Sequence, residues 1–465
     1  MSVHLVNDVH SQLNATRVER IIEPRGLDAI VETVRAACAS GAQLALSGGR
    51  HAMGGQQFAT DAWLLDMRGH ATIHDFDQER GLITADGGIQ WPELIAGCAE
   101  RHRAGAPVWG IRQKQTGADR LTLGGALSAN VHGRGLRMPP IVADIEAFTL
   151  VDARAEVRRC SRTENAGLFA LAIGGYGLFG IIADVTLRLM PRRKVERRVE
   201  ILTLEELLRV PEERDTSEWL FGDFQYSIDE RSPDFLRRGV FSAYHRIADD
   251  APMPDTPAQL REDDWHRLFH LAHTDRARVF ADYSAFYLGT HGQRYWSDTH
   301  QLSLYLDDYH AALDRRLGAT CRGSEMITEI YVPRPALAEF MENAADVLRR
   351  GDVPVVYGTV RLVERDDESF LAWAREPWAC IIFNLHVEHT AAGIAAAELE
   401  FRSLIDCGLA VGGSYYLTYH RWATRAQVEA AHPRFAEFLR EKRARDPGEV
   451  FTSDWYRHHR ALFAA

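Results

Sequence analysis

A histidine set among four glycines, directly after a short apolar run, constrains the fold of this chain more than any other feature. The apolar run at 44–46 is typical of a strand, and the loop at 47–57 that follows it contains His51. Glycines let the backbone turn sharply and bring unobstructed N–H groups against an anion. The loop therefore predicts a phosphate site, with a dinucleotide pyrophosphate as its natural occupant. For such a cluster taken alone, a glycine-rich turn with an incidental histidine is the simpler interpretation.

The length and charge of the chain limit its organisation and its partners. With 465 residues the chain exceeds the size at which one core usually stops growing, so we expect two domains. The formal net charge of −11 disfavours non-specific binding to nucleic acid or to an anionic membrane surface. We therefore expect a small-molecule partner and no nucleic acid.

Neither the N-terminal residues nor the cysteines are typical of a secreted protein or a metalloprotein. Residues 1–8 show no basic region followed by an apolar one, and no long uncharged apolar run occurs. The six cysteines lie far apart without a Cys-x-x-Cys pair, and no His-Glu-x-x-His motif is present. We expect a soluble cytoplasmic enzyme with reduced thiols, no membrane segment and no metal.

Apolar periodicity predicts the order of elements in the first part of the chain. Apolar residues at helical spacing predict a helix over 27–38. Strands are predicted at 62–67 and, after a hairpin turn, at 82–85, and a helix begins near Trp91. This order fits an α+β domain better than a regular βαβ repeat. A charge-rich tract at 192–198 marks a candidate domain crossing.

Two further glycine-rich segments occur in the same part of the chain. Small residues at 121–135 would let a planar ligand approach the backbone closely. The dinucleotide fingerprint Gly-x-Gly-x-x-Gly occurs at 175–180, but a Rossmann fingerprint follows a strand and opens a helix. Here a helix-like stretch at 164–173 precedes it, and an alternating stretch at 181–189 follows. We interpret the fingerprint as a tight turn from helix to strand.

Taken together, the three segments resemble the vanillyl-alcohol-oxidase superfamily of flavoproteins, whose FAD domain is also named after p-cresol methylhydroxylase. The resemblance covers about 20–195 and 413–465, and the motif layout is similar to that of alditol oxidases, cytokinin dehydrogenases and decaprenylphosphoryl-ribose oxidase. It implies a set of FAD-binding residues on the three glycine-rich segments. Besides His51 these are Ser47, Gly48, Gly49, Arg50, Ala52, Met53, Gly54, Gln56, Thr116, Gly117, Thr122, Gly124, Gly125, Ser128, Asn130, His132, Gly133, Gly175, Gly177, Gly180, Ile181 and Ile182.

The resemblance also implies a covalent bond from His51 to the 8α-methyl of the flavin. A neutral imidazole is a competent nucleophile, which agrees with this role. Relatives with two covalent links add a cysteine from the second glycine-rich region, but 113–125 contains none, so we expect a single link. For His132, a hydrogen bond to the backbone of its own glycine loop is the preferred interpretation over catalysis.

The implied fold is an α+β flavoprotein with two domains. The FAD-binding domain would comprise 1–195 and a C-terminal segment at 413–465 that returns to it. A substrate or cap domain at 196–412 would place an antiparallel sheet over the flavin.

Candidate catalytic residues occur in strand-like stretches of the second half. Asn384 and His386 share one face of an otherwise apolar stretch, and the unperturbed pKa of a histidine suits proton abstraction near neutrality. Glu329 lies on another alternating stretch, where an ion pair with Arg334 or another arginine is an alternative role. Arg361 lies on a third.

The stretch at 414–422 adds Tyr416, Tyr419 and His420 as candidates. Decaprenylphosphoryl-ribose and alditol oxidases place a lysine in this region, and Tyr419 occupies the matching position here. A tyrosine base needs its pKa lowered by a nearby cation, which Arg361 would supply if the fold brought it close. Tyr419, His420 and His386 remain rival general bases.

The expected function is an FAD-dependent oxidoreductase that oxidises an alcohol carbon of a polar, sugar-like or polyol substrate. Hydride would pass to flavin N5, and oxygen or another electron acceptor would reoxidise the cofactor. Phenolic, lactone and amine substrates remain open. Alternatives are a flavin-binding scaffold or partner subunit without turnover, and a nicotinamide-dependent dehydrogenase that uses the fingerprint at 175–180.

Overall fold

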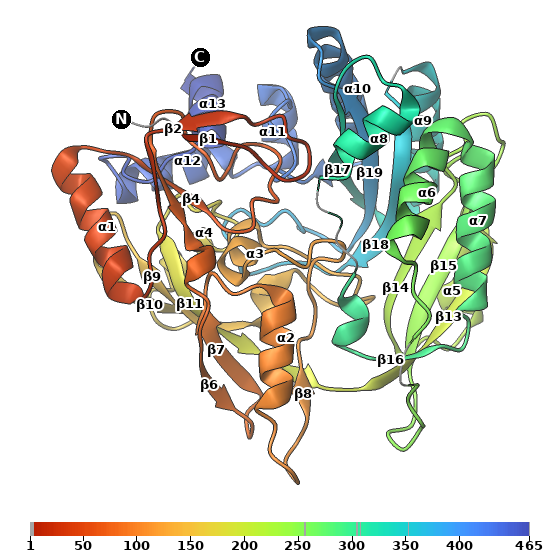
Figure 1. The fold of residues 1–465 in the computed structure, drawn as a ribbon, viewed down its shortest axis with the longest axis horizontal. Coiled ribbons are helices and arrows are strands. Elements are labelled where there is room, and N and C mark those ends of the chain that lie inside the picture. Colours follow the sequence, from red (N-terminus) through yellow and green to blue (C-terminus); the bar gives the residue numbers. More distant parts are fainter. Residues whose placement is uncertain (1–3, 255–256, 304–305, 307, 352, 465) are drawn as a thin grey trace.

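The computed structural model describes residues 4–254, 257–303, 306, 308–351 and 353–464. Figure 1 shows an α+β molecule in which the N-terminal elements and the last three helices lie on one side, and a large sheet with its helices on the other. Within the described part of the chain, no helix is long and apolar enough to cross a membrane.

The first glycine-rich loop follows a short parallel sheet. Its strands run in the order β3-β5-β4. Helix α1 crosses from β3 to β4, buries its apolar side and ends at Gly41, which has the left-handed conformation that favours glycine. The loop lies between β4 and β5. The bounds are β3 (Arg20–Ile22), α1 (Leu27–Ser40), β4 (Leu44–Ser47) and β5 (Trp63–Asp66).

A five-stranded antiparallel sheet completes the N-terminal part, in the order β10-β9-β11-β7-β6. Its strands are β6 (Ile73–Asp77), β7 (Leu82–Asp86), β9 (Ile145–Val151), β10 (Val157–Ser161) and β11 (Ile181–Arg188). Three helices and two small strand pairs accompany it: α2 (Trp91–Glu100), α3 (Leu123–Ala129), α4 (Ala166–Ala172), β1 (His4–Val6) with β2 (Thr16–Val18), and β8 (Trp109–Gly110) with β12 (Met190–Pro191).

The fingerprint at 175–180 joins helix α4 to strand β11, which pairs antiparallel with both of its neighbours. The predicted turn from helix to strand is confirmed, and the order is the reverse of a Rossmann fingerprint. The second glycine-rich segment folds as helix α3, which the sequence analysis did not predict. Thr122 caps this helix by accepting a hydrogen bond from the Gly125 N–H.

The second part of the molecule is built on an eight-stranded antiparallel sheet, in the order β16-β13-β15-β14-β18-β19-β17-β20. The strands are β13 (Lys194–Thr203), β14 (Trp219–Tyr226), β15 (Arg238–Arg246), β16 (Arg294–Trp296), β17 (Gly323–Pro333), β18 (Val355–Val363), β19 (Trp378–Glu388) and β20 (Ser414–Tyr415). The helices are α5 (Leu204–Glu213), α6 (Glu262–Thr274), α7 (Arg276–Gly289), α8 (His310–Leu317), α9 (Leu337–Arg350) and α10 (Ala391–Ala410).

The two faces of this sheet differ because side chains alternate along each strand. On one face, Phe383 contacts Phe340 of α9, and Ile330 lies close against Gly408 of α10. The opposite face, which we call the cavity face, carries polar residues that line a cavity. These are Glu329 on β17, Tyr357 and Arg361 on β18, and Asn384 on β19.

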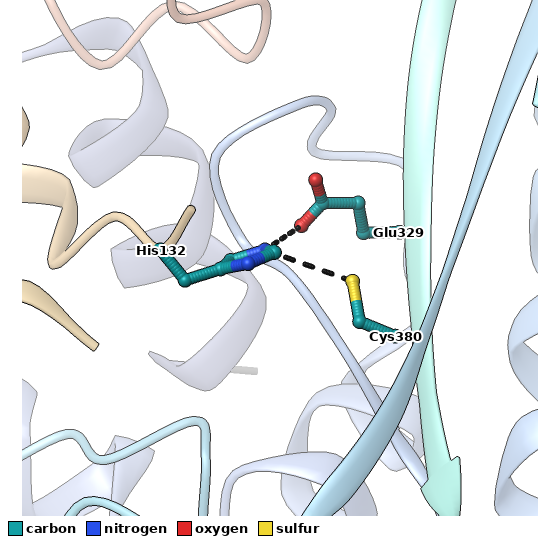
Figure 2. Close-up of side chains that lie close together, drawn as sticks. All are labelled: His132, Glu329 and Cys380. Atoms are coloured by element: carbon teal, nitrogen blue, oxygen red, sulfur yellow. Dashed lines mark hydrogen bonds and ion pairs between the residues drawn. The ribbon is translucent and has the colours of Figure 1, made fainter. Parts of the chain in front are cut away.

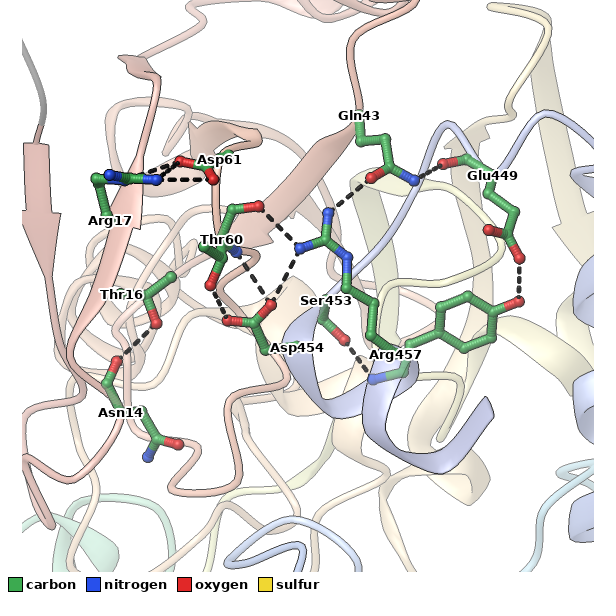
Figure 3. Close-up of polar contacts among 11 residues, drawn as sticks. Asn14, Thr16, Arg17, Gln43, Thr60, Asp61, Glu449, Ser453, Asp454 and Arg457 are labelled. Carbon is green, nitrogen blue, oxygen red and sulfur yellow. Dashed lines mark hydrogen bonds and ion pairs between the residues drawn. The ribbon is translucent and has the colours of Figure 1, made fainter. Parts of the chain in front are cut away.

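The C-terminal segment connects the two parts. Strand β20 pairs with β17 at the edge of the large sheet, and the rest of the predicted stretch at 414–422 is irregular. Helices α11 (Arg425–Ala431), α12 (Phe435–Arg445) and α13 (Asp454–Ala464) then return to the N-terminal part. Asp454 accepts a hydrogen bond from the Thr60 hydroxyl at 2.8 Å, and Arg457 donates one to Gln43 at 2.6 Å; Figure 3 shows these side chains.

Candidate active site

A cavity of about 970 Å³ lies between the glycine-rich loops and the cavity face of the large sheet. Its volume is at the upper end of the usual range for small-molecule sites. Most of the predicted FAD-binding residues line it: Ser47, Gly48, Gly49, Arg50, His51, Ala52, Met53, Gln56, Thr116, Gly117, Thr122, Gly124, Gly125, Ser128, Gly177, Gly180, Ile181 and Ile182. The predicted catalytic residues on its lining are Glu329, Arg361, Asn384, Tyr416 and Tyr419.

The first glycine loop needs its glycines for close packing. A Cβ at Gly48 would lie 2.0 Å from the Thr122 hydroxyl, and one at Gly49 would lie 2.1 Å from the Arg120 carbonyl oxygen. The loop is also tied to the C-terminal segment, since the Met53 N–H donates to the Thr418 carbonyl at 3.1 Å. Gln56 donates to the Leu417 carbonyl at 2.7 Å. The loop backbone is therefore held against the cavity from two sides.

His51 lies on the cavity lining as a neutral imidazole. Burial lowers its pKa well below the ordinary value, and neighbouring His10 lowers it further. The Nε2 atom of His10 lies 2.7 Å from Nδ1 of His51, and burial lowers the pKa of His10 to about 4. Because both rings are neutral near pH 7, one donates to the other, and His51 stays in its nucleophilic form.

Buried polar atoms without partners test whether this lining fits FAD. The side-chain oxygens of Ser47, Gln115, Thr116 and Thr418 are buried and make no hydrogen bond within the described residues. All four residues line the cavity. Buried polar groups are normally hydrogen-bonded, so these atoms indicate a polar ligand. Together with the glycine loops, they fit the polar groups of FAD.

Five predicted cofactor residues lie off the lining. Gly54 donates its N–H to the Gln56 side chain, and a Cβ at Gly133 or Gly175 would meet backbone oxygens of Lys114 or Leu171. Asn130 ends helix α3 and donates to Asp366 at 2.8 Å. His132 packs on the cavity face, against Glu329 and Cys380, without reaching the lining. The five residues therefore contact other parts of the protein and not the cavity.

Figure 2 shows His132 beside Glu329 and Cys380. The His132 Nδ1 atom lies 3.0 Å from the Gly133 carbonyl oxygen, which is the backbone contact that the sequence analysis preferred. Its Nε2 atom lies 3.2 Å from the Glu329 carboxylate and 3.6 Å from the Cys380 sulfur. The ring therefore links the second glycine-rich segment to the cavity face.

Glu329 is the centre of the polar network on the cavity face. Its carboxylate accepts hydrogen bonds from Tyr331 at 2.8 Å and from Tyr419 at 2.9 Å, in addition to the His132 contact. Burial would raise the pKa of Glu329, but His132 and Arg361 outweigh that effect and lower it. Glu329 is therefore a carboxylate at neutral pH. The alternative pair with Arg334 does not form, since Arg334 contacts Glu364 instead.

Tyr419 differs from the expected tyrosine base. Burial and the neighbouring Glu329 carboxylate raise its pKa well above the ordinary value, and the opposing effect of Arg361 is small. Arg361 is close enough to lower this pKa, as the sequence analysis required of a cation, but burial and the adjacent Glu329 carboxylate outweigh it, so Tyr419 stays protonated at neutral pH. Tyr416 also lines the cavity, but its hydroxyl donates to the Ala129 carbonyl at 2.6 Å.

His386 and His420 lie outside the cavity lining. His420 contacts the Thr328 hydroxyl at 3.3 Å, and burial lowers its pKa to about 3. The Nδ1 atom of His386 lies 3.6 Å from buried Glu325, whose other neighbours are His273, His310 and Tyr309. The ring of His386 covers Gly323, where a Cβ would lie 2.3 Å from it.

Two groups in the described residues offer metal-ligating atoms within 4.8 Å of one another. These are His132 with Glu329 and Cys380, and His273 with Glu325 and His386. In both groups, histidines contact the buried carboxylate directly. The contacts explain how each carboxylate is stabilised, and neither group requires a metal for that purpose.

Some cavity residues were missed by the sequence analysis. His10 is 41 positions from His51 and lies in a segment without a recognisable pattern. Arg134 directly follows His132-Gly133, so its place in the second glycine-rich segment is a usable signal. Asp223 and Tyr357 belong to strands whose pairing could not be predicted.

Comparisons with known proteins agree with this geometry. Residues 18–161 match the FAD binding domain family. The chain is 26% identical over 410 residues to L-gulono-1,4-lactone dehydrogenase of Mycobacterium tuberculosis. The aligned region covers 86% of each protein. It is 22% identical over 417 residues to decaprenylphosphoryl-β-D-ribose oxidase of Mycolicibacterium smegmatis, with 86% of this chain and 85% of that protein covered.

A shorter match occurs with cytokinin dehydrogenase 10 of Oryza sativa subsp. japonica. It is 31% identical over 159 residues, which are 32% of this chain and 28% of that protein. The matched domain, the relatives and the two-part α+β fold agree with one another. The chain is therefore an FAD-dependent oxidoreductase, and its matched domain, relatives and fold are consistent with the vanillyl-alcohol-oxidase and p-cresol-methylhydroxylase superfamily.

Proposed function

We propose that this enzyme oxidises an alcohol carbon of a polar, sugar-like or polyol substrate and that FAD is attached covalently to His51. The observation that carries the proposal is the Tyr419–Glu329 hydrogen bond on the lining of the same cavity as His51. A hydroxyl bound there would find a proton acceptor opposite the glycine-rich loops. FAD, when bound, supplies the hydride acceptor.

The two residues form a route for the substrate hydroxyl proton. Tyr419 donates its own hydrogen to Glu329 and accepts a long hydrogen bond of 3.5 Å from Gln115, so its oxygen keeps one lone pair to accept from the substrate. The substrate proton would pass to the Tyr419 oxygen while the Tyr419 proton passes to Glu329. Loss of hydride from the carbon makes the hydroxyl strongly acidic, so a carboxylate with a lowered pKa is a sufficient base.

The covalent attachment rests on His51 being buried, neutral and on the cavity lining. Acid precipitation of the purified protein should leave yellow colour in the pellet, and the intact mass should exceed that of the chain by one FAD. His51→Ala should release the flavin on denaturation. His74→Ala, which removes a half-exposed histidine of the same part of the molecule, serves as the control. A His51→Ala protein that kept its flavin after denaturation would refute the attachment site.

Turnover is tested by anaerobic bleaching of the flavin absorbance with polyols, sugars and lactones. Bleaching by a polyol or sugar supports alcohol oxidation, whereas bleaching by lactones alone would shift the substrate class. That alternative is favoured by the relative named L-gulono-1,4-lactone dehydrogenase. A flavin that no candidate bleaches, phenols and amines included, would favour a binding or partner subunit. Peroxide formation in air then distinguishes an oxidase from a dehydrogenase.

We also propose the division of the chain into an FAD-binding part at 1–195, a cap at 196–412 and a returning segment at 413–465. Strand β13 begins the large sheet at Lys194, and β20 adds the returning segment to its edge. Limited proteolysis of the holoenzyme should cut first in the irregular segments next to these boundaries, at 192–193 before β13 and at 411–413 before β20. First cuts within β9 or β19 would contradict the division.

A further inference from the structure

Arg361 is a buried cation whose hydrogen-bond donors are largely unused. It lies on β18, lines the cavity and is 6% exposed. Its Nε and Nη1 atoms are buried and make no hydrogen bond, and its guanidinium forms no ion pair within the described residues. Burying an uncompensated charge is costly, so such a group normally has an anionic partner.

The protein carboxylates near Arg361 are not that partner. The register that pairs Phe224 with Val360 places Asp223 next to Arg361 on the same face. Asp223 nevertheless accepts from Gln225 at 2.8 Å through Oδ2. Its Oδ1 atom makes no hydrogen bond within the described residues and lies 3.8 Å from the Arg134 guanidinium. Glu329 already contacts two tyrosines and a histidine.

The charges on the cap side of the cavity leave a positive excess. Three buried arginines, Arg134, Arg197 and Arg361, face only Asp223 and Glu329 on the lining. Arg197 donates to the Tyr244 and Thr290 hydroxyls, and Arg134 donates to the His300 carbonyl. Arg134 lies 3.8 Å from Asp223 and keeps one buried nitrogen, Nε, without a hydrogen bond. Arg361 keeps two such nitrogens and has no carboxylate within ion-pair distance among the described residues, so it is the arginine of this group with the most donors left for a ligand.

Unused acceptors lie on the same face. The Oδ1 atoms of Asn384 and Asp223 are buried without hydrogen bonds, and both residues line the cavity. Two free acceptors suit hydroxyl groups, and a free guanidinium suits a carboxylate. A single excess positive charge matches one carboxylate.

We infer that the substrate is a polyhydroxylated carboxylic acid whose carboxylate binds Arg361. The inference rests on the proposed function and names the substrate class of the same site. Asn384 and Asp223 would accept hydrogen bonds from the hydroxyls, while Arg361 would donate to the carboxylate through its unused nitrogens. An electron-rich part of the bound flavin is the other source of negative charge for Arg361, and the experiment distinguishes the two.

The test compares two ligands that differ at one end. Gluconate and glucitol share a six-carbon polyhydroxyl chain, and only gluconate carries a carboxylate. Each is titrated into the holoenzyme, and perturbation of the flavin spectrum gives Kd. The wild type should bind gluconate about 10- to 100-fold more tightly than glucitol. Arg361→Gln should remove that preference and leave the Kd of glucitol unchanged within about twofold.

Two further variants control the result. Arg361→Lys keeps the charge but loses the planar fork, so it should retain part of the preference. Arg365→Gln removes an exposed arginine four residues along the chain and should change neither Kd. If the Arg361 variants do not fold, the inference is still tested by the wild-type comparison.

Three results would overturn the inference. One is equal binding of gluconate and glucitol by the wild type, and another is equal weakening of both by Arg361→Gln. The third concerns Arg361→Gln without ligand: its flavin spectrum and the affinity of its flavin for sulfite change, while the preference for gluconate does not. That result would assign Arg361 to the flavin. Bleaching by neutral polyols without a carboxylate preference would leave the proposed function standing.

Discussion

At the scale of single residues, Tyr419 and Glu329 have separate roles in moving the substrate proton. The hydroxyl of Tyr419 donates to Glu329 at 2.9 Å and is held protonated by its raised pKa. Tyr419→Phe removes the relay and leaves the ring in place. We expect kcat to fall roughly 10²- to 10⁴-fold, the usual contribution of a positioned acid–base group. The rate of anaerobic flavin bleaching measures it.

Tyr415→Phe is the matched control for this variant. Tyr415 is also buried and lies in the same segment, but it is not on the cavity lining. Its substitution should leave the bleaching rate within about twofold of the wild type. A Tyr419→Phe enzyme that bleached at the wild-type rate would exclude the relay and return the role of base to another group.

The chemistry of single residues explains which of these roles the sequence could predict. The ordinary pKa of histidine made His386 attractive as a base, but that value applies to an isolated imidazole. The contact with Glu325 depends on the pairing of β17 with β19, which the local sequence does not specify. By contrast, the loop around His51 is predictable because its glycines are adjacent in the chain.

At the scale of elements, helix α8 and strand β17 are joined by a buried pair of charges. The Nδ1 atom of His310 lies 2.7 Å from Glu325, and Tyr309 donates to the same carboxylate at 2.6 Å. Burial would lower the pKa of His310, but Glu325 outweighs it and raises that pKa. Burial would raise the pKa of Glu325, and the surrounding histidines lower it well below the ordinary value.

These shifts predict how stability depends on pH. The contribution of His310 to the free energy of unfolding is fully present below the unfolded pKa of about 6.5. It is lost as pH rises through the raised pKa of the folded state. The contribution of Glu325 is present above about 4.3 and is lost as pH falls through its lowered value. His310→Gln should therefore lower Tm most between about pH 4.5 and 6.5.

A thermal-melt series from pH 5 to pH 9 measures this effect. Breaking a buried pair costs roughly 3 to 5 kcal/mol, so Tm should fall by several degrees at pH 6 and by less at pH 9. His266→Gln on α6 removes a less buried histidine and should lower Tm only slightly, by the same amount at every pH. A Tm difference for His310→Gln that grew with pH would contradict the pairing.

Elements with strong periodicity could be predicted from the sequence. Helix α1 and strand β11 match the predicted 27–38 and 181–189 to within a few residues. Helix α3 was missed because its glycines and serine have low helix propensity, and its stability comes from packing and from the Thr122 cap. The 414–422 stretch alternates in sequence, but only Ser414–Tyr415 has a strand partner.

At the scale of the whole molecule, the cavity is lined by residues that are far apart in the sequence, because the C-terminal segment returns to the N-terminal part. Leu44 pairs with Phe451 in parallel, and the Leu44 N–H donates to the Val450 carbonyl at 2.6 Å. The first glycine loop therefore depends on residues about 400 positions away. The family resemblance predicted this return, whereas local patterns carry no information about contacts of such separation.

The joint lining also predicts how FAD affects the stability of the whole protein. The cavity is lined by the glycine loops, by the large sheet and by Thr418 and Tyr419 of the returning segment, so a ligand there contacts both parts. We expect FAD to raise Tm in the His51→Ala variant, which binds the cofactor reversibly under the proposed function. At 100 times Kd the gain is about 2.7 kcal/mol, or roughly 3 °C for a chain of this length that unfolds as one unit. Calorimetry of flavin-depleted His51→Ala protein, expressed under riboflavin limitation and titrated with FAD, measures the shift.

AMP provides the control, because it lacks the isoalloxazine ring that would lie near the sheet, and it should raise Tm by less. Two transitions of which FAD shifts only one would show that the cofactor does not couple the two parts.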